Sequence, residues 1–109
     1  MPKRILVVDD DAMMRSFLST VMREEGYAVE EAGNGKRALE TLHRSEFDLV
    51  VTDLRMPDVS GMELLRRMHE SGQPLPVVMI TAYGSVDSAV EAMRLGAFDF
   101  IIKPFDVTH

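Results

Sequence analysis

Three short, continuously apolar runs, at residues 5–8, 49–51 and 77–80, constrain the fold of this chain most strongly. They do not alternate with polar residues, which is typical of strands that helices cover on both faces of a sheet. With two further segments they predict five strands, at residues 4–8, 28–32, 48–52, 76–80 and 98–102. We therefore expect a sheet whose central strands are fully buried.

The segments between these strands carry apolar residues three and four positions apart, which is the spacing of amphipathic helices. The four apolar stripes are Met14, Phe17, Leu18, Val21 and Met22; Ala38, Leu39 and Leu42; Met62, Leu65 and Met68; and Val86, Ala89, Val90 and Met93. Ser85 is a predicted N-cap, and Gly26 and Gly96 are predicted helix ends. Strands and helices thus alternate, which indicates an α/β domain with a parallel sheet.

Size and charge exclude several classes of protein. The chain has 109 residues, with 12 Lys and Arg against 18 Asp and Glu, and a formal net charge of −6. This suits one small domain that repels phosphate backbones, so we expect no direct nucleic-acid contact. Its apolar runs are far too short to cross a membrane, and cysteine is absent. We expect a cytoplasmic protein.

Polar residues follow four of the predicted strands. In open α/β sheets, ligands bind beyond the carboxyl ends of the strands, where the strand order reverses. The residues at those ends are Asp9-Asp10-Asp11, Asp53, Thr81 and Lys103-Pro104. Because carboxylates stand where a dinucleotide site needs glycines, a dinucleotide-binding domain is excluded.

Converging carboxylates at these strand ends predict a cation site. Like charges a few ångströms apart repel strongly, and a divalent cation with oxygen ligands offsets that repulsion. Carboxylates and water suit Mg²⁺, with Mn²⁺ as the alternative, better than zinc. Asp9, Asp10 and Asp53 supply three negative charges, and Mg²⁺ with Lys103 supplies three positive ones. Such a pocket is near neutral and suits an incoming phosphoryl group.

Each of these residues also has a purely structural interpretation. The triple Asp could be a turn and helix cap, and Asp11 is best read as that cap. Asp53 could cap the next segment, Thr81 could be a turn hydroxyl, and Lys103 could be solvated. For all of them to be structural, four separate strand ends would have to carry matching charged and hydrogen-bonding groups by chance. The structural interpretation is therefore weaker for the whole set than for any single residue.

The motifs in order are Val7-Val8-Asp9-Asp10, Thr52-Asp53-Leu54-Arg55-Met56-Pro57 with Gly61, Ile80-Thr81-Ala82 and Lys103-Pro104-Phe105. Over nearly the whole chain, this pattern resembles the receiver (phosphoacceptor) domains of bacterial two-component response regulators. The runs at 55–58 and 96–100 resemble receivers of NtrC-like, alternative-sigma-factor transcription activators.

The resemblance implies a flavodoxin-like, doubly wound, five-stranded parallel sheet in the order 2-1-3-4-5. Residues 1–109 then form one receiver domain, truncated before a fifth helix expected to begin near Asp106, with the output domain outside this chain. Apolar residues near strand five and on the first helix are expected to be partly uncovered. We therefore expect self-association, as a homodimer or by a swapped element.

The resemblance also implies a role for each site residue. Asp53 takes a phosphoryl group from a sensor histidine kinase. Asp10 and Asp53 bind Mg²⁺ directly, Asp9 binds it through water, and the backbone carbonyl of Arg55 completes the protein ligands. The chain is then a signalling domain and not a metabolic enzyme, although it catalyses its own phosphorylation and dephosphorylation.

Further implied roles concern the switch and the phosphoryl lifetime. Thr81 donates its hydroxyl to a phosphoryl oxygen, and the Lys103 ammonium neutralises charge during the transfer. Pro104 holds Lys103 in place through a cis Lys103–Pro104 bond. Thr81 and Phe100 form the switch that reshapes the surface of helix four, strand five and helix five. Arg55 and Tyr83 flank the phosphoryl group, and we expect them to slow its hydrolysis. Replacement of both by small residues should then speed decay of the phosphorylated form.

Two alternatives remain open. A Mg²⁺-dependent phosphohydrolase of the haloacid-dehalogenase type also uses an Asp nucleophile, but it needs a second Asp where this chain has Arg55. A receiver-like interaction module that is never phosphorylated would not need Asp10, Asp53, Thr81 and Lys103 together.

Overall fold

The structure, a computed structural model, describes residues 2–72, 75–82 and 84–102. Strands and helices alternate along the described chain. The elements are β1 (Arg4–Val8), α1 (Ala12–Glu24), β2 (Ala28–Ala32), α2 (Gly35–Arg44), β3 (Leu49–Thr52), α3 (Gly61–Glu70), β4 (Val77–Thr81), α4 (Val86–Arg94) and β5 (Asp99–Ile102). No helix among the described residues has the length and apolar content to span a membrane.

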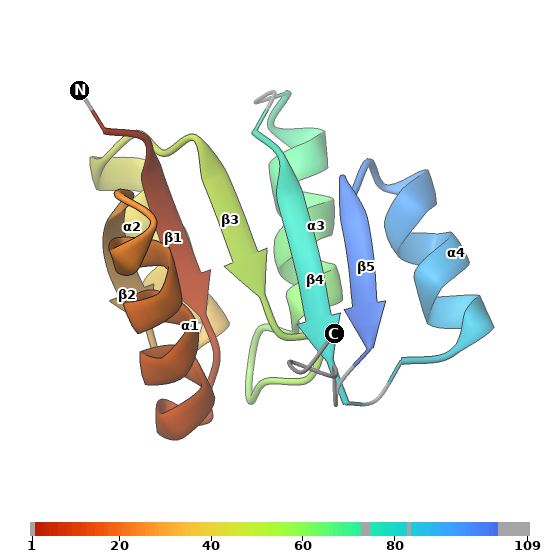
Figure 1. Cartoon of the computed structure of the whole chain (residues 1–109). Coiled ribbons are helices and arrows are strands. Elements are labelled where there is room, and N and C mark those ends of the chain that lie inside the picture. Colours follow the sequence, from red (N-terminus) through yellow and green to blue (C-terminus); the bar gives the residue numbers. More distant parts are fainter. Residues whose placement is uncertain (1, 73–74, 83, 103–109) are drawn as a thin grey trace.

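All five strands are parallel and lie in the order β2-β1-β3-β4-β5, which confirms the predicted topology. The chain runs from β1 to one side to form β2 and then crosses to the other side for β3, β4 and β5. The arrowheads of β1, β3, β4 and β5 in Figure 1 consequently point to the same edge of the sheet. The reversal of strand order lies between β1 and β3, so a ligand site is expected at their carboxyl ends.

Two hydrophobic clusters lie on opposite faces of the sheet. On one face, Leu18 of α1 packs with Ile5 and Val51 of the strands. On the other face, side chains of α2, α3 and α4 pack against the sheet, including Leu64 and Ala92. Figure 1 shows α3 and α4 beside β4 and β5. The central strands are therefore buried on both sides, as their continuous apolar runs predicted.

Three of the predicted strands have boundaries that were wrong by one residue. The strands expected at 48–52, 76–80 and 98–102 are Leu49–Thr52, Val77–Thr81 and Asp99–Ile102. The difference matters most for Thr81, which is the last residue of β4 and pairs with Ile102 of β5. Pairing with β5 thus extends β4 by one residue beyond its apolar run.

The apolar stripe predicted for the fourth helix does not face the core. Val86, Val90 and Met93 are 80%, 53% and 51% exposed, whereas Ala92 is fully buried. Periodicity defines a stripe but not the surface it meets, and here the small alanine allows α4 to lie close to the sheet. The predicted N-cap at Ser85 is confirmed, because its side chain accepts a hydrogen bond from the backbone N–H of Ser88.

Residues expected to be uncovered near α1 and β5 are indeed partly exposed. Phe17 and Val21 on α1 are half exposed, as is Ile102 on β5, and Phe98 is more so. The predicted helix ends at Gly26 and Gly96 coincide with positive φ angles of 95° and 92°. The fifth helix expected near Asp106 lies outside the described residues.

Candidate functional site

A cleft of about 620 Å³ opens at the carboxyl ends of β1 and β3, at the reversal of strand order. It is lined by Asp10, Asp11, Met14, Asp53, Arg55, Met56, Pro57, Ser60 and Ala82. These residues come from the loops after β1, β3 and β4 and from the start of α1. The sheet topology alone thus assembles the cleft from parts of the chain that are far apart in sequence.

Three carboxylates converge at this cleft. One carboxylate oxygen from each of Asp9, Asp10 and Asp53 lies within 4.8 Å of the other two. Asp9 is 1% exposed and Asp53 is 7% exposed, whereas Asp10 is open to solvent. They form the one group of three acidic, His or Cys side chains with such spacing among the described residues.

The loop after β1 holds its acidic side chains through backbone hydrogen bonds. The backbone N–H of Asp9 donates to the carbonyl of Ala32 on β2 at 3.2 Å. The N–H of Asp11 donates to Oδ1 of Asp9 at 2.9 Å. Asp11 itself accepts from the N–H groups of Met13 and Met14, at 3.0 and 3.3 Å. Asp11 is therefore the N-cap of α1, which confirms that interpretation.

Asp53 is held at the end of β3 by close backbone packing. Its N–H donates to the carbonyl of Val8 at 3.0 Å, and its Oδ1 accepts from the N–H of Leu54 at 2.7 Å. A Cβ added at Gly61 would lie 1.9 Å from the carbonyl oxygen of Asp53. Only glycine lets the start of α3 pack this closely against the residue, so Gly61 fixes one wall of the site.

The donor set of this cluster suits a hard divalent cation. Two of the three carboxylates are almost fully removed from water, where their mutual repulsion is strong. Carboxylate oxygens with access to solvent fit Mg²⁺ or Mn²⁺, and the cluster contains no His or Cys that would favour zinc. The residues present therefore fit a magnesium site.

The other predicted site residues lie outside the carboxylate cluster or outside the described residues. Arg55 is exposed and lines the cleft. Thr81 is fully buried beside Ala82, which contributes to the cleft wall. Phe100 is half-buried on β5, and a Cβ at Gly84 would lie 2.9 Å from its ring. The loop after β4 thus packs against the predicted switch aromatic. Lys103, Pro104 and Tyr83 lie outside the described residues.

Sequence reasoning overlooked two residues at this edge. Ser60 lines the cleft and caps α3 by accepting from the N–H of Glu63 at 3.1 Å. A Ser three residues before a Glu is a recognisable cap signal that was available in the sequence. Arg15 donates from Nη1 to the backbone carbonyl of Asp9 at 2.7 Å. No sequence pattern indicated that contact.

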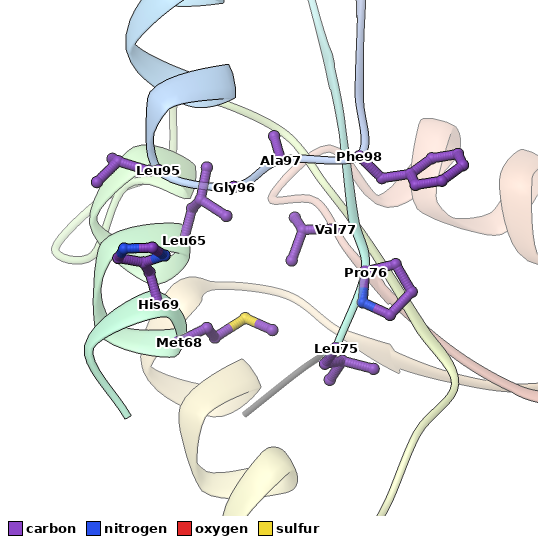
Figure 2. Close-up of a pocket in the computed structure, with 10 residues that line it drawn as sticks. All are labelled: Leu65, Met68, His69, Leu75, Pro76, Val77, Leu95, Gly96, Ala97 and Phe98. Atoms are coloured by element: carbon purple, nitrogen blue, oxygen red, sulfur yellow. The ribbon is translucent and has the colours of Figure 1, made fainter. Parts of the chain in front are cut away.

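A second hollow, of about 500 Å³, lies at the opposite edge of the sheet (Figure 2). Its wall comes from the end of α3, the start of β4 and the segment joining α4 to β5. His69 is the one ionisable side chain among its lining residues, which are otherwise apolar or glycine. The groups able to bind ions or transfer phosphoryl groups therefore gather at the carboxyl edge instead.

Comparison with known proteins identifies the family. The family model for the response regulator receiver domain matches residues 5–109. The chain is a response regulator receiver domain. The predicted resemblance is thereby confirmed, and the arrangement of acidic residues belongs to a signalling domain.

Relatives of this receiver include transcription regulators. The transcriptional regulatory protein ZraR of Klebsiella oxytoca is 46% identical over 102 residues, which are 94% of this chain and 23% of that protein. The regulatory protein AtoC of Escherichia coli (strain K12) is 43% identical over 104 residues, 95% of this chain and 23% of that protein. The receiver spans about a quarter of the length of these relatives.

Solved structures support the same fold. The crystal structure of a response regulator receiver protein from Pseudomonas putida superposes with a TM-score of 0.92 at 33% identity. The alignment covers 99% of this chain and 91% of that chain.

Proposed function

We propose that this receiver accepts a phosphoryl group on Asp53 from a sensor histidine kinase, in a reaction that depends on Mg²⁺. The supporting observation is the convergence of Asp9, Asp10 and Asp53 at the reversal of strand order. A carboxylate cluster that is costly to bury without a cation is poorly explained by folding alone. It is well explained by a site that assembles a cation and a phosphoryl group.

The proposed transfer is an in-line displacement. A carboxylate oxygen of Asp53 attacks the phosphorus of a phosphohistidine, the P–N bond breaks, and the imidazole leaves with the bonding electron pair. The product is an acyl phosphate on Asp53. The hydrogen bond from the Leu54 N–H to Oδ1 orients the carboxylate before the reaction. This transfer needs positioning and charge neutralisation more than covalent assistance.

In the proposed site, Asp10 and Asp53 bind Mg²⁺ directly, Asp9 binds it through water, and the backbone carbonyl of Arg55 contributes a further oxygen. When bound, the ion neutralises charge on the transferred group. Lys103 adds a further positive charge. We also propose that the exposed side chain of Arg55, together with Tyr83, slows attack by water on the acyl phosphate.

The proposed output is a change in the surface made by α4 and β5. Thr81 hydrogen-bonds to the new phosphoryl oxygens and draws the β4–α4 loop with it, and Phe100 turns inward. Gly84 packs against Phe100, so movement of this loop reaches the aromatic ring directly. We propose that this change controls an output domain in transcription regulation, and that the receiver forms a homodimer and phosphorylates itself from small donors.

Incubation of the full chain with acetyl phosphate and Mg²⁺, followed by intact mass, tests this function. We expect a gain of one phosphoryl group in the parent and none in Asp53→Asn. Asp58→Asn is the matched control, because Asp58 is exposed, lies in the same loop and has a φ of 67° that Asn tolerates. A parent that stays unmodified at saturating Mg²⁺ supports the interaction module and overturns the proposal.

A further inference from the structure

One arginine links the acidic loop to the neighbouring strand. Arg15, on the first turns of α1, donates from Nη1 to the carbonyl oxygen of Asp9 at 2.7 Å. That carbonyl belongs to the peptide unit joining Asp9 to Asp10, the two acidic residues that precede α1 in the cluster. Arg15 therefore contacts the backbone between two of the three converging carboxylates, without itself belonging to the cluster.

Arg15 is itself held in place by β2. Its Nε donates to Oε1 of Glu31 at 3.2 Å, and the two side chains are 23% and 30% exposed. A Cβ added at Gly33 would lie 3.4 Å from Nη1 of Arg15, so the backbone after β2 closely confines the guanidinium. The planar guanidinium donates in two fixed directions at once, which an ammonium group cannot do.

The peptide units flanking Asp9 are thus held at two points. The N–H of Asp9 donates to the carbonyl of Ala32, and its carbonyl accepts from Arg15. The orientation of the peptide after Asp9 sets the direction in which the Asp10 side chain leaves the backbone. A hydrogen bond that restrains this peptide restrains the carboxylate as well.

We propose that Arg15 is a positioning residue for the divalent cation site, and that it acts by holding the peptide between Asp9 and Asp10. The proposal rests on the proposed function, because it requires that the cluster bind Mg²⁺. Groups that orient metal-binding side chains through hydrogen bonds commonly change metal affinity by about 10- to 100-fold when removed.

Positioning and simple electrostatics predict opposite results for Arg15→Ala. A guanidinium close to the cluster repels an incoming cation, so removal of its charge alone would tighten Mg²⁺ binding. Loss of the peptide restraint weakens binding instead, because the carboxylates must then be ordered when the cation binds. The direction of the change separates the two causes.

Arg23→Ala is the matched control. Arg23 lies on the same helix and forms an ion pair with the same Glu31 carboxylate at 3.6 Å, but its hydrogen bond goes to the carbonyl of Val29. Arg23→Ala therefore removes the same charge and the same kind of ion pair as Arg15→Ala, but no contact with the acidic loop. Arg15→Lys keeps the charge but has a single donor nitrogen, so it cannot contact Asp9 and Glu31 in the same geometry.

The experiment is isothermal titration of Mg²⁺ into the full chain without a phosphoryl donor, with thermal melting to verify folding of each variant. We expect Arg15→Ala to raise the Mg²⁺ dissociation constant about tenfold. Arg15→Lys should raise it less, and Arg23→Ala should stay close to the parent. Because Arg15→Lys retains a donor and the charge, its intermediate affinity tests the same restraint if Arg15→Ala does not fold.

Two results overturn the inference while leaving the proposed function intact. One is an Arg15→Ala variant that binds Mg²⁺ as tightly as the parent or more tightly. The other is an Arg23→Ala variant that loses as much affinity as Arg15→Ala. A parent that does not bind Mg²⁺ at all would contradict the magnesium site itself, and this inference with it.

Discussion

The two edges of the sheet bury very different groups. At the carboxyl edge, Asp9, Asp53 and Thr81 are almost fully buried. At the amino edge, the end of α3 and the start of β4 bury apolar side chains such as Leu65 and surround the hollow of Figure 2. Both edges belong to the same strands and the same helix α3. The kind of group buried, rather than the fold, therefore distinguishes them.

This difference shows where the domain gives up stability for chemistry. Buried apolar groups stabilise the fold, whereas clustered carboxylates oppose it until a cation binds. Local violations of good packing and charge rules are expected at functional sites and few elsewhere. Changes at the amino edge should therefore cost stability alone, and changes at the carboxyl edge should alter cation binding as well.

The largest loss of stability is expected at the amino edge. Leu65 is 2% exposed and packs in the larger hydrophobic cluster. Leu65→Ala should lower the free energy of unfolding by about 2–5 kcal/mol, because it removes buried methyl groups and leaves a cavity. Urea denaturation measures this loss. Mg²⁺ affinity of the folded variant should be unchanged, and a large loss of affinity would break the distinction between the edges.

The two ends of α3 provide a smaller, paired test. Gly61→Ala places a methyl group against the Asp53 carbonyl and should lower the free energy of unfolding by about 1–3 kcal/mol. It should also weaken Mg²⁺ binding, since the backbone of Asp53 must move. Gly72→Ala is the control at the other end, where φ is 76° and no atom lies within 4 Å of an added Cβ.

Gly72→Ala should cost about 1 kcal/mol through its backbone conformation alone. Its Mg²⁺ affinity should equal that of the parent. Equal losses of Mg²⁺ affinity in both glycine variants would show that α3 stability, and not the contact with Asp53, controls the site.

The smallest expected effect concerns Glu63, an acidic residue near the carboxyl edge that forms ion pairs and lies outside the carboxylate cluster. Hydrogen bonds from Arg67, and secondarily from Arg66, lower the pKa of Glu63 below its ordinary value of 4.5. A lowered folded-state pKa contributes stability above the unfolded pKa, and that stability is lost as pH falls through the folded value. Glu63→Gln should thus melt slightly below the parent at pH 6, with a gap that narrows at lower pH. A gap that widens on acidification contradicts this.

Much of the difference between the two edges of the sheet could be predicted from the sequence. The continuous apolar runs indicated buried strands, and the strand ends indicated that Asp9, Asp10 and Asp53 would meet, because parallel strands end at one edge. These features are local in the sequence. Periodicity did not reveal that Val86 and Val90 face solvent, since packing of the small Ala92 decides which side of α4 meets the sheet.

The hydrogen bond from Arg15 to the Asp9 carbonyl could not be predicted from the sequence either. It depends on how α1 crosses the sheet and on which backbone carbonyl comes within reach of a long side chain. Gly61 belongs to the sequence motif around Asp53, but only the structure shows that its lack of a Cβ leaves room for the Asp53 carbonyl. Such contacts arise from tertiary packing, which no spacing rule describes.

The central claim is that the carboxylates of the carboxyl edge are assembled for a cation rather than for the fold. Thermal melting of the parent, Asp10→Asn and the control Asp58→Asn, with and without Mg²⁺, tests it most directly. Without Mg²⁺, Asp10→Asn should melt above the parent, by about 1 kcal/mol of stability, because one repelling charge is removed.

With Mg²⁺ at 100 times its dissociation constant, the parent should gain about 2.7 kcal/mol and Asp10→Asn much less, so that their order reverses. Asp58→Asn should follow the parent in both conditions. A parent whose melting temperature does not respond to Mg²⁺, or an Asp10→Asn variant that responds equally, would contradict the claim.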